Sequence, residues 1–469
     1  MKNMFWVVIP AYNTEDYIRE TIDSVIGQTI GFEEHIMLYL IDDGSTDGTF
    51  NCLREYKKKY PDNVVIEHFE NNHGVSAARN TAISEIRQKK DATVLFLDSD
   101  DLLKEDAIWQ AAQFFEKEPE VNIASLKILY FDAKEGEHRL NWKFEKCQVV
   151  DIKENYNYPQ FYIGGVFLRR SALQAIEFDE RMNFWEDALA INRCILGEGR
   201  YGLIRDGIYY YRKRPDESSL VDRAWTDKER YTTFLDRGYR ALMSYSRRKY
   251  HRVIPYVQFL VAYHLRLFLW KSKGELISEL LTEDEMKKFR KNLKKVLRPI
   301  KPKIISEIPT SVPVLEMIMS IKQGKKVRAR RTYTENDCIF SFRGTELARM
   351  SERKVRIYDT LSEREGFEGM WHGIFATPVF QMAEADYIFM EHEGTRMIPE
   401  RYPCRRKLFI LGEKVRNYRF AAFAFWKPDD WDEFQFGIHT NGIDIMLNHV
   451  VFEDGKWNWE GEKEKNSEF

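Results

Sequence analysis

Carboxylates crowd together directly after a short apolar stretch early in the chain. Residues 94–97 are Val, Leu, Phe and Leu, and Asp98, Asp100 and Asp101 follow them. Carboxylates gathered in a half-buried place repel one another and are costly to desolvate. A hard divalent cation relieves both costs, because magnesium and manganese prefer oxygen ligands. The pattern therefore predicts a metal site, with a solvated acidic turn before a helix as the alternative.

Polar residues also follow other apolar stretches nearby. Residues 5–10, 36–41 and 64–69 are apolar runs, and each ends in a polar cluster. Any one of these clusters, taken alone, is equally compatible with helix caps and surface charge. In an open parallel sheet, however, the carboxyl ends of the strands share one edge, and ligands bind there. Together, the four clusters predict a ligand site at that edge.

The apolar runs themselves are predicted to be strands separated by helices. After the first run, Ile18, Ile22, Val25 and Ile26 recur at helical spacing. Strand and helix then alternate four times, at a spacing of about 30 residues, which is typical of βαβ units. The first part of the chain is therefore predicted to form an α/β fold around a mainly parallel sheet.

Four motifs in this order resemble those of the family 2 glycosyltransferases, which have the GT-A fold. They are V-V-I-P-A-Y-N (7–13), I-D-D-G-S-T-D-G-T (41–49), N-N-H-G-V-S-A-A-R-N (71–80) and L-D-S-D-D (97–101). The resemblance covers residues 1–222 and implies a Rossmann-like sheet that binds a nucleotide sugar. It also implies a nucleoside diphosphate sugar as donor, with UDP as the expected nucleotide. A divalent cation (Mn²⁺ or Mg²⁺) and inversion at the anomeric carbon are further implications.

The same resemblance assigns residues to the nucleotide. Pro10 and Tyr12 would border the nucleobase, and Asp43 would bind the base or the ribose, with Asp42 beside it. Arg79 would lie against the nucleotide. Each of these residues has a plainer interpretation as a cap, a core residue or a surface charge.

The metal is assigned in the same way. Asp98 would meet the ribose or the metal, and Asp100 would be the direct metal ligand. A cation between the two phosphates stabilises the charge that develops as the sugar bond breaks. Because the chain has no G-x-x-x-x-G-K motif, the cation is expected to balance most of that charge.

A basic segment further along is similar to the part of the family that closes over the diphosphate. It comprises residues 209–214 (Y-Y-Y-R-K-R) together with Ser218 and Ser219. Arg212 is the predicted diphosphate contact, and Arg214 is the alternative.

An inverting transfer also needs a base for the proton of the acceptor hydroxyl. The resemblance places this role on Asp187, in an E-D pair that opens a helix over residues 188–191. Glu186 and Trp185, with Phe184, are expected on the acceptor side, since sugar rings stack on aromatic side chains. The alternatives are an acidic helix start favoured by the helix dipole and a core tryptophan.

Composition limits the class of protein. The chain has 469 residues, a formal net charge of −2 and 43% hydrophobic residues. It therefore has room for two or three folded domains and no general attraction to nucleic acid, which is not expected as a partner. The cysteines are scattered without a C-x-x-C pair, which fits the reducing cytoplasm. They are Cys52, Cys147, Cys194, Cys338 and Cys404.

One segment is strongly basic. Residues 287–331 hold 15 Lys and Arg against Glu307 and Glu316. This segment is either a solvated face or a surface that attracts an anionic membrane or a polyanionic acceptor. The start of the chain lacks the layout of a signal peptide, and residues 253–270 are interrupted by polar side chains. A cytoplasmic location, with peripheral contact at the inner face of the membrane, is expected.

Three regions and a tail are predicted. Residues 1–222 form the GT-A domain, and residues 223–332 form a helical, basic linker region. From 333 to 460, short aromatic-rich runs separated by turn residues predict an all-β, sandwich-like domain. Its aromatic side chains are interpreted as core, with a sugar-binding face or a homo-oligomer contact as the alternative. Residues 461–469 are expected to be disordered.

These observations predict an inverting, metal-dependent glycosyltransferase that moves a sugar from a UDP-sugar to a hydroxyl of a glycan or an anionic wall polymer. Two other functions compete with it. A nucleotidyltransferase would also use a metal and a nucleotide, but it usually carries a glycine- and basic-rich loop after the first strand, where Ala11, Tyr12 and Asn13 stand here. A catalytically silent glycan-binding or scaffolding protein is the rival outside the enzymes.

Overall fold

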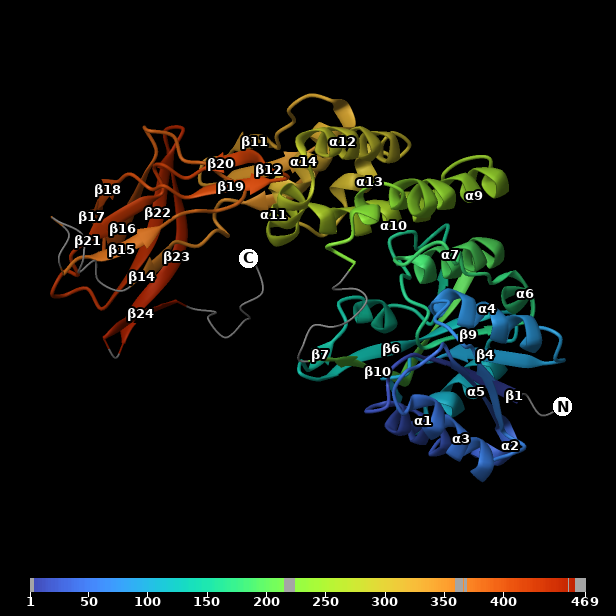
Figure 1. Cartoon of the computed structure of the whole chain (residues 1–469). Coiled ribbons are helices and arrows are strands. Elements are labelled where there is room, and N and C mark those ends of the chain that lie inside the picture. The colour runs from blue at the N-terminus through green and yellow to red at the C-terminus, as the bar shows by residue number, and fades with distance from the viewer. Residues whose placement is uncertain (1–3, 215–223, 359–365, 367–368, 454, 460–469) are drawn as a thin grey trace. The chain divides into compact units, whose positions relative to one another are not determined.

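The computed structural model describes residues 4–214, 224–358, 366, 369–453 and 455–459 (Figure 1). The chain forms two compact units, Met1–Val261 and Ala262–Phe469, and each is described by itself. The domain boundaries expected after residues 222, 332 and 460 stay predictions. The expected disordered tail, 461–469, lies outside the described residues.

The first unit contains one ten-stranded mixed sheet. The parallel strands β1, β2, β3 and β4 form one side of it, as the alternating pattern predicts. Strand β9 is antiparallel to both of its neighbours, β4 and β6. In the order in which they lie, the strands are β3 (Val64–His68), β2 (Ile36–Asp42), β1 (Met4–Ala11), β4 (Ala92–Phe96), β9 (Val166–Arg169), β6 (Ile123–Asp132), β10 (Arg200–Lys213) and β5 (Leu102–Leu103), with β7 (Gly136–Glu137) beside β6 and β8 (Val149–Asp151) beside β10.

Both faces of β1, β2 and β4 are largely buried, which explains their nearly continuous apolar sequences. Phe5, Val7 and Ile9 of β1 join one core with Ile18 and Ile22 of helix α1. The residues between them on β1 are also buried and point to the opposite face. In Figure 1, α1 and α3 lie on one side of the sheet, and α4 and α6 lie on the other.

The helices of this unit connect its strands and cover the sheet. They are α1 (Ile18–Ile26), α2 (Phe32–His35), α3 (Thr49–Lys59), α4 (Val75–Ile86), α5 (Ala107–Lys117), η1 (Asn141–Glu145), α6 (Arg170–Ala175), α7 (Glu186–Glu198), η2 (Lys228–Tyr231), the π-helix η3 (Leu235–Arg240) and α9 (Ala241–Tyr250). Helix α10 (Pro255–Leu265) and η4 (Arg266–Leu269) follow, and most of their apolar residues are buried. Residues 253–270, which the sequence left open as a buried or a surface-lying helix, are therefore mostly buried.

The second unit starts within α10 and includes η4, and the helices that follow bury their apolar faces. They are α11 (Lys271–Leu280), α12 (Glu283–Leu297), α13 (Pro302–Ser306) and α14 (Val312–Gln323). Thr282 and Glu285 form a capping box at the start of α12, in which each side chain accepts from the other residue's backbone N–H. Within the described parts of the chain, no helix is both long enough and apolar enough to cross a membrane.

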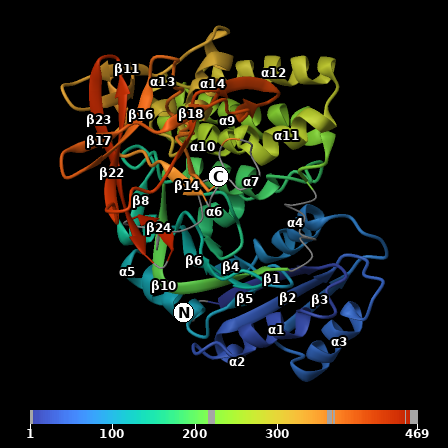
Figure 2. The same ribbon diagram turned by 90° about the vertical axis from the view of Figure 1, so that its left-hand side faces the viewer.

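The rest of the second unit is all β, as predicted. A four-stranded and a five-stranded sheet share one core, in which Phe423 packs against Phe436, and Phe425 against Phe434. Trp431 and Trp457 are buried in this core, whereas Trp426 is 60% exposed. Figure 2 shows β16, β22 and β23 side by side in the larger sheet.

The strands fall into four sheets. The four-stranded sheet holds β14 (Arg356–Tyr358), β15 (Trp371–Ile374), β21 (Ala422–Phe425) and β18 (Glu400–Tyr402), and the five-stranded sheet holds β17 (Thr395–Met397), β16 (Tyr387–His392), β22 (Glu433–Thr440), β23 (Ile443–Glu453) and β24 (Lys456–Trp459). The smaller sheets are β11 (Arg330–Tyr333), β12 (Cys338–Phe342) and β13 (Thr345–Arg349), and the pair β19 (Lys407–Ile410) and β20 (Glu413–Asn417).

Candidate active site

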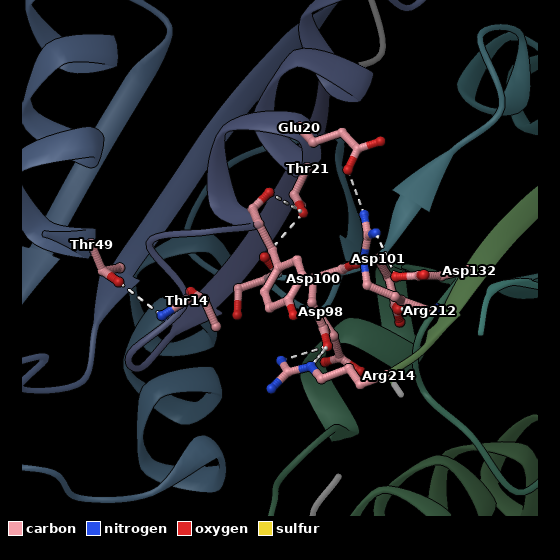
Figure 3. Close-up of polar contacts among 12 residues, drawn as sticks. Thr14, Glu20, Thr21, Thr49, Asp98, Asp100, Asp101, Asp132, Arg212 and Arg214 are labelled. Carbon is pink, nitrogen blue, oxygen red and sulfur yellow. Dashed lines mark hydrogen bonds and ion pairs between the residues drawn. The ribbon is translucent and has the colours of Figure 1, made fainter. Parts of the chain in front are cut away.

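The turn after β4 lies at the carboxyl edge of the parallel strands. Leu97 still donates its backbone N–H to Val8 of β1 (3.0 Å), and Asp101 closes the turn by donating to the carbonyl of Asp98 (3.1 Å). The turn therefore starts from a fixed strand end, which positions the three carboxylates (Figure 3).

Asp101 points into the protein. Its side chain accepts from the hydroxyl of Tyr209 (2.6 Å) and from the backbone N–H of Arg212 (2.8 Å), and the residue is 1% exposed. Burial raises the pKa of Asp101 well above its usual range, and the nearby Asp100 and Asp98 raise it further. Asp101 thus ties the turn to β10 and is not available to a ligand.

Asp98 and Asp100 remain accessible, and each faces an arginine. The side chain of Asp98 is 38% exposed and accepts from Nη2 of Arg79 (2.8 Å). That of Asp100 is 21% exposed and accepts from Nε (2.9 Å) and Nη2 (2.6 Å) of Arg214. Burial raises the pKa of Asp100; Arg214 opposes this effect, and Asp98 adds to it.

This pair fits a divalent cation of the magnesium type. Such ions are commonly held by one or two carboxylates, with phosphates and water completing the shell. Asp98 and Asp100 offer those oxygens, and burial, with a smaller contribution from Asp98, raises the pKa of Asp100. Among the described residues, no group of three or more His, Cys, Asp or Glu side chains has the geometry to hold a metal by itself. Phosphate oxygens would therefore have to supply part of the shell.

The two candidate diphosphate contacts occupy different places. Arg212 is fixed, because it pairs with Glu20 and Asp132 and donates from Nε to the carbonyl of Asp100 (2.8 Å) (Figure 3). Arg214 instead bonds the Asp100 carboxylate itself. Sequence reasoning left the two open, and the structure places only Arg214 directly on the predicted metal ligand. Ser218 and Ser219 lie outside the described residues.

The residues predicted to meet the nucleotide lie at the neighbouring strand ends. Pro10 is buried at the end of β1 opposite Ile41, and Tyr12, just past the strand, is 46% exposed. Asp43 is 3% exposed and accepts from the backbone N–H groups of His73 (2.7 Å) and Gly74 (2.8 Å). Asp43 therefore fixes the loop that precedes α4, whatever else it binds.

Asp187 and Glu186 lie in the first turn of α7, and Arg79, which bonds Asp98, also contacts this turn. Nη1 of Arg79 lies 3.5 Å from Oε1 of Glu186. Burial and Glu186 raise the pKa of Asp187 to about 8, Arg79 opposes them, and Asp98 adds a smaller increase. The ionised form of this carboxyl is a stronger base than an ordinary aspartate, and it predominates only above about pH 8.

Arg79 is the link that brings the two groups of carboxylates into one site. It is 4% exposed and stacks over the ring of Phe178 at 5.3 Å. Burial acts to lower the pKa of Arg79, but Asp98, Glu186 and Asp187 outweigh it and raise it. Arg79 was predicted to lie against the nucleotide. In the structure it is buried and contacts both Asp98 and Glu186.

The two aromatic residues before Glu186 differ in their surroundings. Trp185 adopts a left-handed backbone conformation (φ 66°), is 5% exposed and packs against Phe234 and Tyr239. Phe184 instead lines a small hollow of about 30 Å³ beside the start of α7. The acceptor role of Trp185 stays a prediction, and Phe184 has the more open position. Arg181, Met182, Asn183, Ala224, Asp227, Glu229, Arg230, Thr233, Phe234 and Arg237 complete the lining.

Tyr209 is a structural residue of the site that sequence reasoning missed. Besides Asp101, its hydroxyl accepts from the backbone N–H of Asp98 (3.2 Å). Its ring fills the space beside Gly164 and Gly165, where an added Cβ would lie 2.8 Å and 3.0 Å from Tyr209 atoms. The three consecutive tyrosines at 209–211 offered no signal to single out the first.

Comparisons with known proteins identify the family of this chain. The model of the family described as "Glycosyl transferase family 2" matches residues 6–176. The "Minor teichoic acid biosynthesis protein GgaA" of Bacillus subtilis (strain 168) is 35% identical over 449 residues, which cover 95% of this chain and 97% of that protein.

Solved structures share the fold. The crystal structure of S. aureus TarS has a TM-score of 0.56 at 14% identity and covers 97% of this chain and 82% of that one. The structure of TarS 1–349 in complex with UDP-GlcNAc has a TM-score of 0.53 at 19% identity and covers 73% and 98%. The predicted GT-A sheet, helical region and C-terminal β structure are therefore confirmed as a fold. The family match and the full-length relative show that this chain belongs to glycosyl transferase family 2.

Proposed function

We propose that this glycosyltransferase is metal-dependent and inverting, and that it moves a sugar from a UDP-sugar to a hydroxyl of a wall-type polymer. One observation carries the proposal: Arg79 contacts both Asp98 and Glu186. The carboxylates suited to a cation and the carboxyl suited to a base therefore lie around one side chain.

The donor half of the site consists of the strand ends. Asp100 and Asp98 would hold Mn²⁺ or Mg²⁺, which when bound supplies positive charge to the diphosphate as the sugar leaves. Tyr12, with Pro10, would border the base, and Asp43 would face the ribose or the base from its fixed position. The nucleotide assignment is supported by TarS, a protein of the same fold whose structure is titled as a complex with UDP-GlcNAc.

The positive charges around the diphosphate have two sources in this chain. Arg212, held by Glu20 and Asp132, would keep its place while the donor binds. Arg214 would exchange its bond with Asp100 for the diphosphate. Arg79 acts in this proposal as a positioning residue, since its contacts are carboxylates of the protein.

The acceptor half begins at α7. Asp187 takes the proton of the acceptor hydroxyl as the oxygen of that hydroxyl bonds to the anomeric carbon. The bond from that carbon to the diphosphate breaks, and the nucleoside diphosphate leaves with the electron pair, so the configuration inverts. Burial and the charge of Glu186 keep the pKa of Asp187 high, and Trp185 packs at the start of the helix that carries it.

A polymer of the teichoic acid kind is the proposed acceptor, because the full-length relative GgaA is named for minor teichoic acid biosynthesis. Two other relatives, at 39% and 28% identity over part of this chain, are named as transferases to poly(ribitol-phosphate), which contains phosphate. The hollow beside α7 suits this chemistry, since Arg181, Arg230 and Arg237 line it, along with two acids.

Three further expectations stay predictions: a cytoplasmic location, peripheral membrane contact through residues 287–331, and self-association through the C-terminal β region. The first is consistent with the cysteines, all five of which are free. Flotation with anionic vesicles tests the second, and a mass measurement in solution tests the third.

The deciding experiment measures nucleoside diphosphate release from a panel of nucleotide sugars with Mn²⁺. Wild type is compared with Asp187→Asn, and we expect a loss of about 10² to 10⁴ in rate for the variant. Equal rates would remove Asp187 from the role of base. No turnover by wild type with any donor would favour a silent glycan-binding protein.

A further inference from the structure

A row of basic side chains runs along one face of α12. The opposite face is buried through Phe289, Leu293, Val296 and Leu297. From first to last, the row extends over about 16 Å at the helical rise of 1.5 Å per residue. The basic residues, which are all exposed and are called here the α12 basic face, are Lys287, Lys288, Lys291, Lys294, Lys295 and Arg298.

Very little of this charge is neutralised within the protein. Among the described residues, the one ion pair made by the α12 basic face joins Lys287 to Asp284 (3.0 Å). Arg290, which lies off the row, pairs with Glu413. The face therefore presents a nearly continuous line of positive charge, and an anionic partner would complement it.

More positive charge lies beside the end of the row. Lys322 of α14 donates to the carbonyls of Leu297 (2.8 Å) and Arg298 (2.9 Å), so the two helices meet there. Nζ of Lys294 reaches the turn at Gly324, and Lys325 and Lys326 follow as exposed residues. The basic surface thus continues beyond α12.

The geometry favours a linear polyanion over a lipid surface. Peripheral helices bind membranes by burying an apolar face in the lipid, but the apolar face of α12 is already buried in the protein. The exposed large apolar side chains of the described residues are all outside α12. The exposed part of α12 can therefore attract a partner only through its line of positive charges.

We propose that the α12 basic face binds a stretch of phosphodiester polymer, with successive phosphates paired to successive turns of the helix. This inference rests on the proposed function, in which such a polymer is the acceptor. A second contact with the same chain would raise the local concentration of acceptor ends and favour repeated transfer.

The test removes three charges from the row. The triple variant Lys288→Gln, Lys291→Gln, Lys295→Gln is compared with wild type and with a control, Lys58→Gln, Lys89→Gln, Lys90→Gln, which removes equally exposed lysines from the first unit. The probes are a fluorescent oligo(glycerol phosphate) and phosphatidylglycerol vesicles. We expect the row variant to bind the oligomer at least about tenfold more weakly, with the salt dependence of log K reduced by roughly 2, and the control to bind like wild type.

Two outcomes would overturn the proposal: equal oligomer affinity in all three proteins, or loss of vesicle binding alone, which would assign the face to lipid. Donor hydrolysis with Mn²⁺ is measured on the same proteins and should not change in the row variant. Absence of hydrolysis in wild type would count against the proposed function and leave the oligomer result to stand separately.

Discussion

Lowering the pH should switch the enzyme off by protonating Asp187. Burial and Glu186 raise the pKa of Asp187 to about 8, and only the ionised carboxylate can take the acceptor's proton. The ionised fraction is about a tenth at one pH unit below this pKa and about a hundredth at 2 units below. Because kcat/KM reports the groups of the free enzyme, we expect it to fall about tenfold for each pH unit below about 8.

The substitution Glu186→Gln tests the cause of this pKa. It removes the negative charge that raises the pKa of Asp187, so the acid limb of the profile should move to lower pH, by about one unit. Glu116→Gln, at an exposed position on α5, serves as the control and should leave the limb in place. The assay is release of nucleoside diphosphate at saturating Mn²⁺. A flat profile from about pH 6 to about pH 9, or a limb unmoved in Glu186→Gln, would refute the reasoning.

Arg79→Met should shift the acid limb of the profile to higher pH, because Arg79 lowers the pKa of Asp187. Arg79→Lys keeps the positive charge and should reverse part of that shift. A profile that does not move in Arg79→Met would show that Arg79 has no effect on the pKa of Asp187. Asp187→Asn should stabilise the fold. The folded-state pKa of Asp187 lies above that of an unfolded aspartate. Ionisation of Asp187 therefore destabilises the fold increasingly from about pH 4 to about pH 8. The difference in Tm between variant and wild type should widen over that pH range, and a constant difference would contradict this. Phe434→Ala, in the core shared by the four-stranded and five-stranded sheets, should lower the free energy of unfolding of the second unit by about 3–5 kcal/mol. Denaturation followed by tryptophan fluorescence would show this loss, because the rings of Trp457 and Phe434 lie 4.8 Å apart.

The sheet of the first unit could be predicted because the apolar runs in the sequence match the buried strands of the structure. The apolar runs at 5–10 and 36–41 lie in adjacent parallel strands whose two faces are largely buried, so apolar residues occupy both faces. The aromatic-rich runs of the C-terminal region were equally readable: residues 338–342 and 434–439 coincide with β12 and the middle of β22. Short edge strands such as β17 and β18 carry no such pattern, and their positions depend on tertiary pairing.

The site was less predictable, since the role of each side chain depends on where the fold points it and not on its residue type. In the sequence, Asp98, Asp100 and Asp101 look alike, but only the fold turns Asp101 inward to Tyr209. Arg212 and Arg214 lie two residues apart on one strand end, and neighbours from distant segments, Glu20 and Asp132, decide which of them is fixed. No local pattern could have identified Glu20.

In the proposed mechanism, Asp98 and Asp100 hold a cation that binds the diphosphate of the nucleotide. Calorimetric titration of UDP into wild type and Asp100→Asn, each with Mn²⁺ and with a chelator, tests it directly. We expect Mn²⁺ to tighten UDP binding to wild type by at least about tenfold and to have no effect on the variant. Equal affinities in all four titrations would contradict the account.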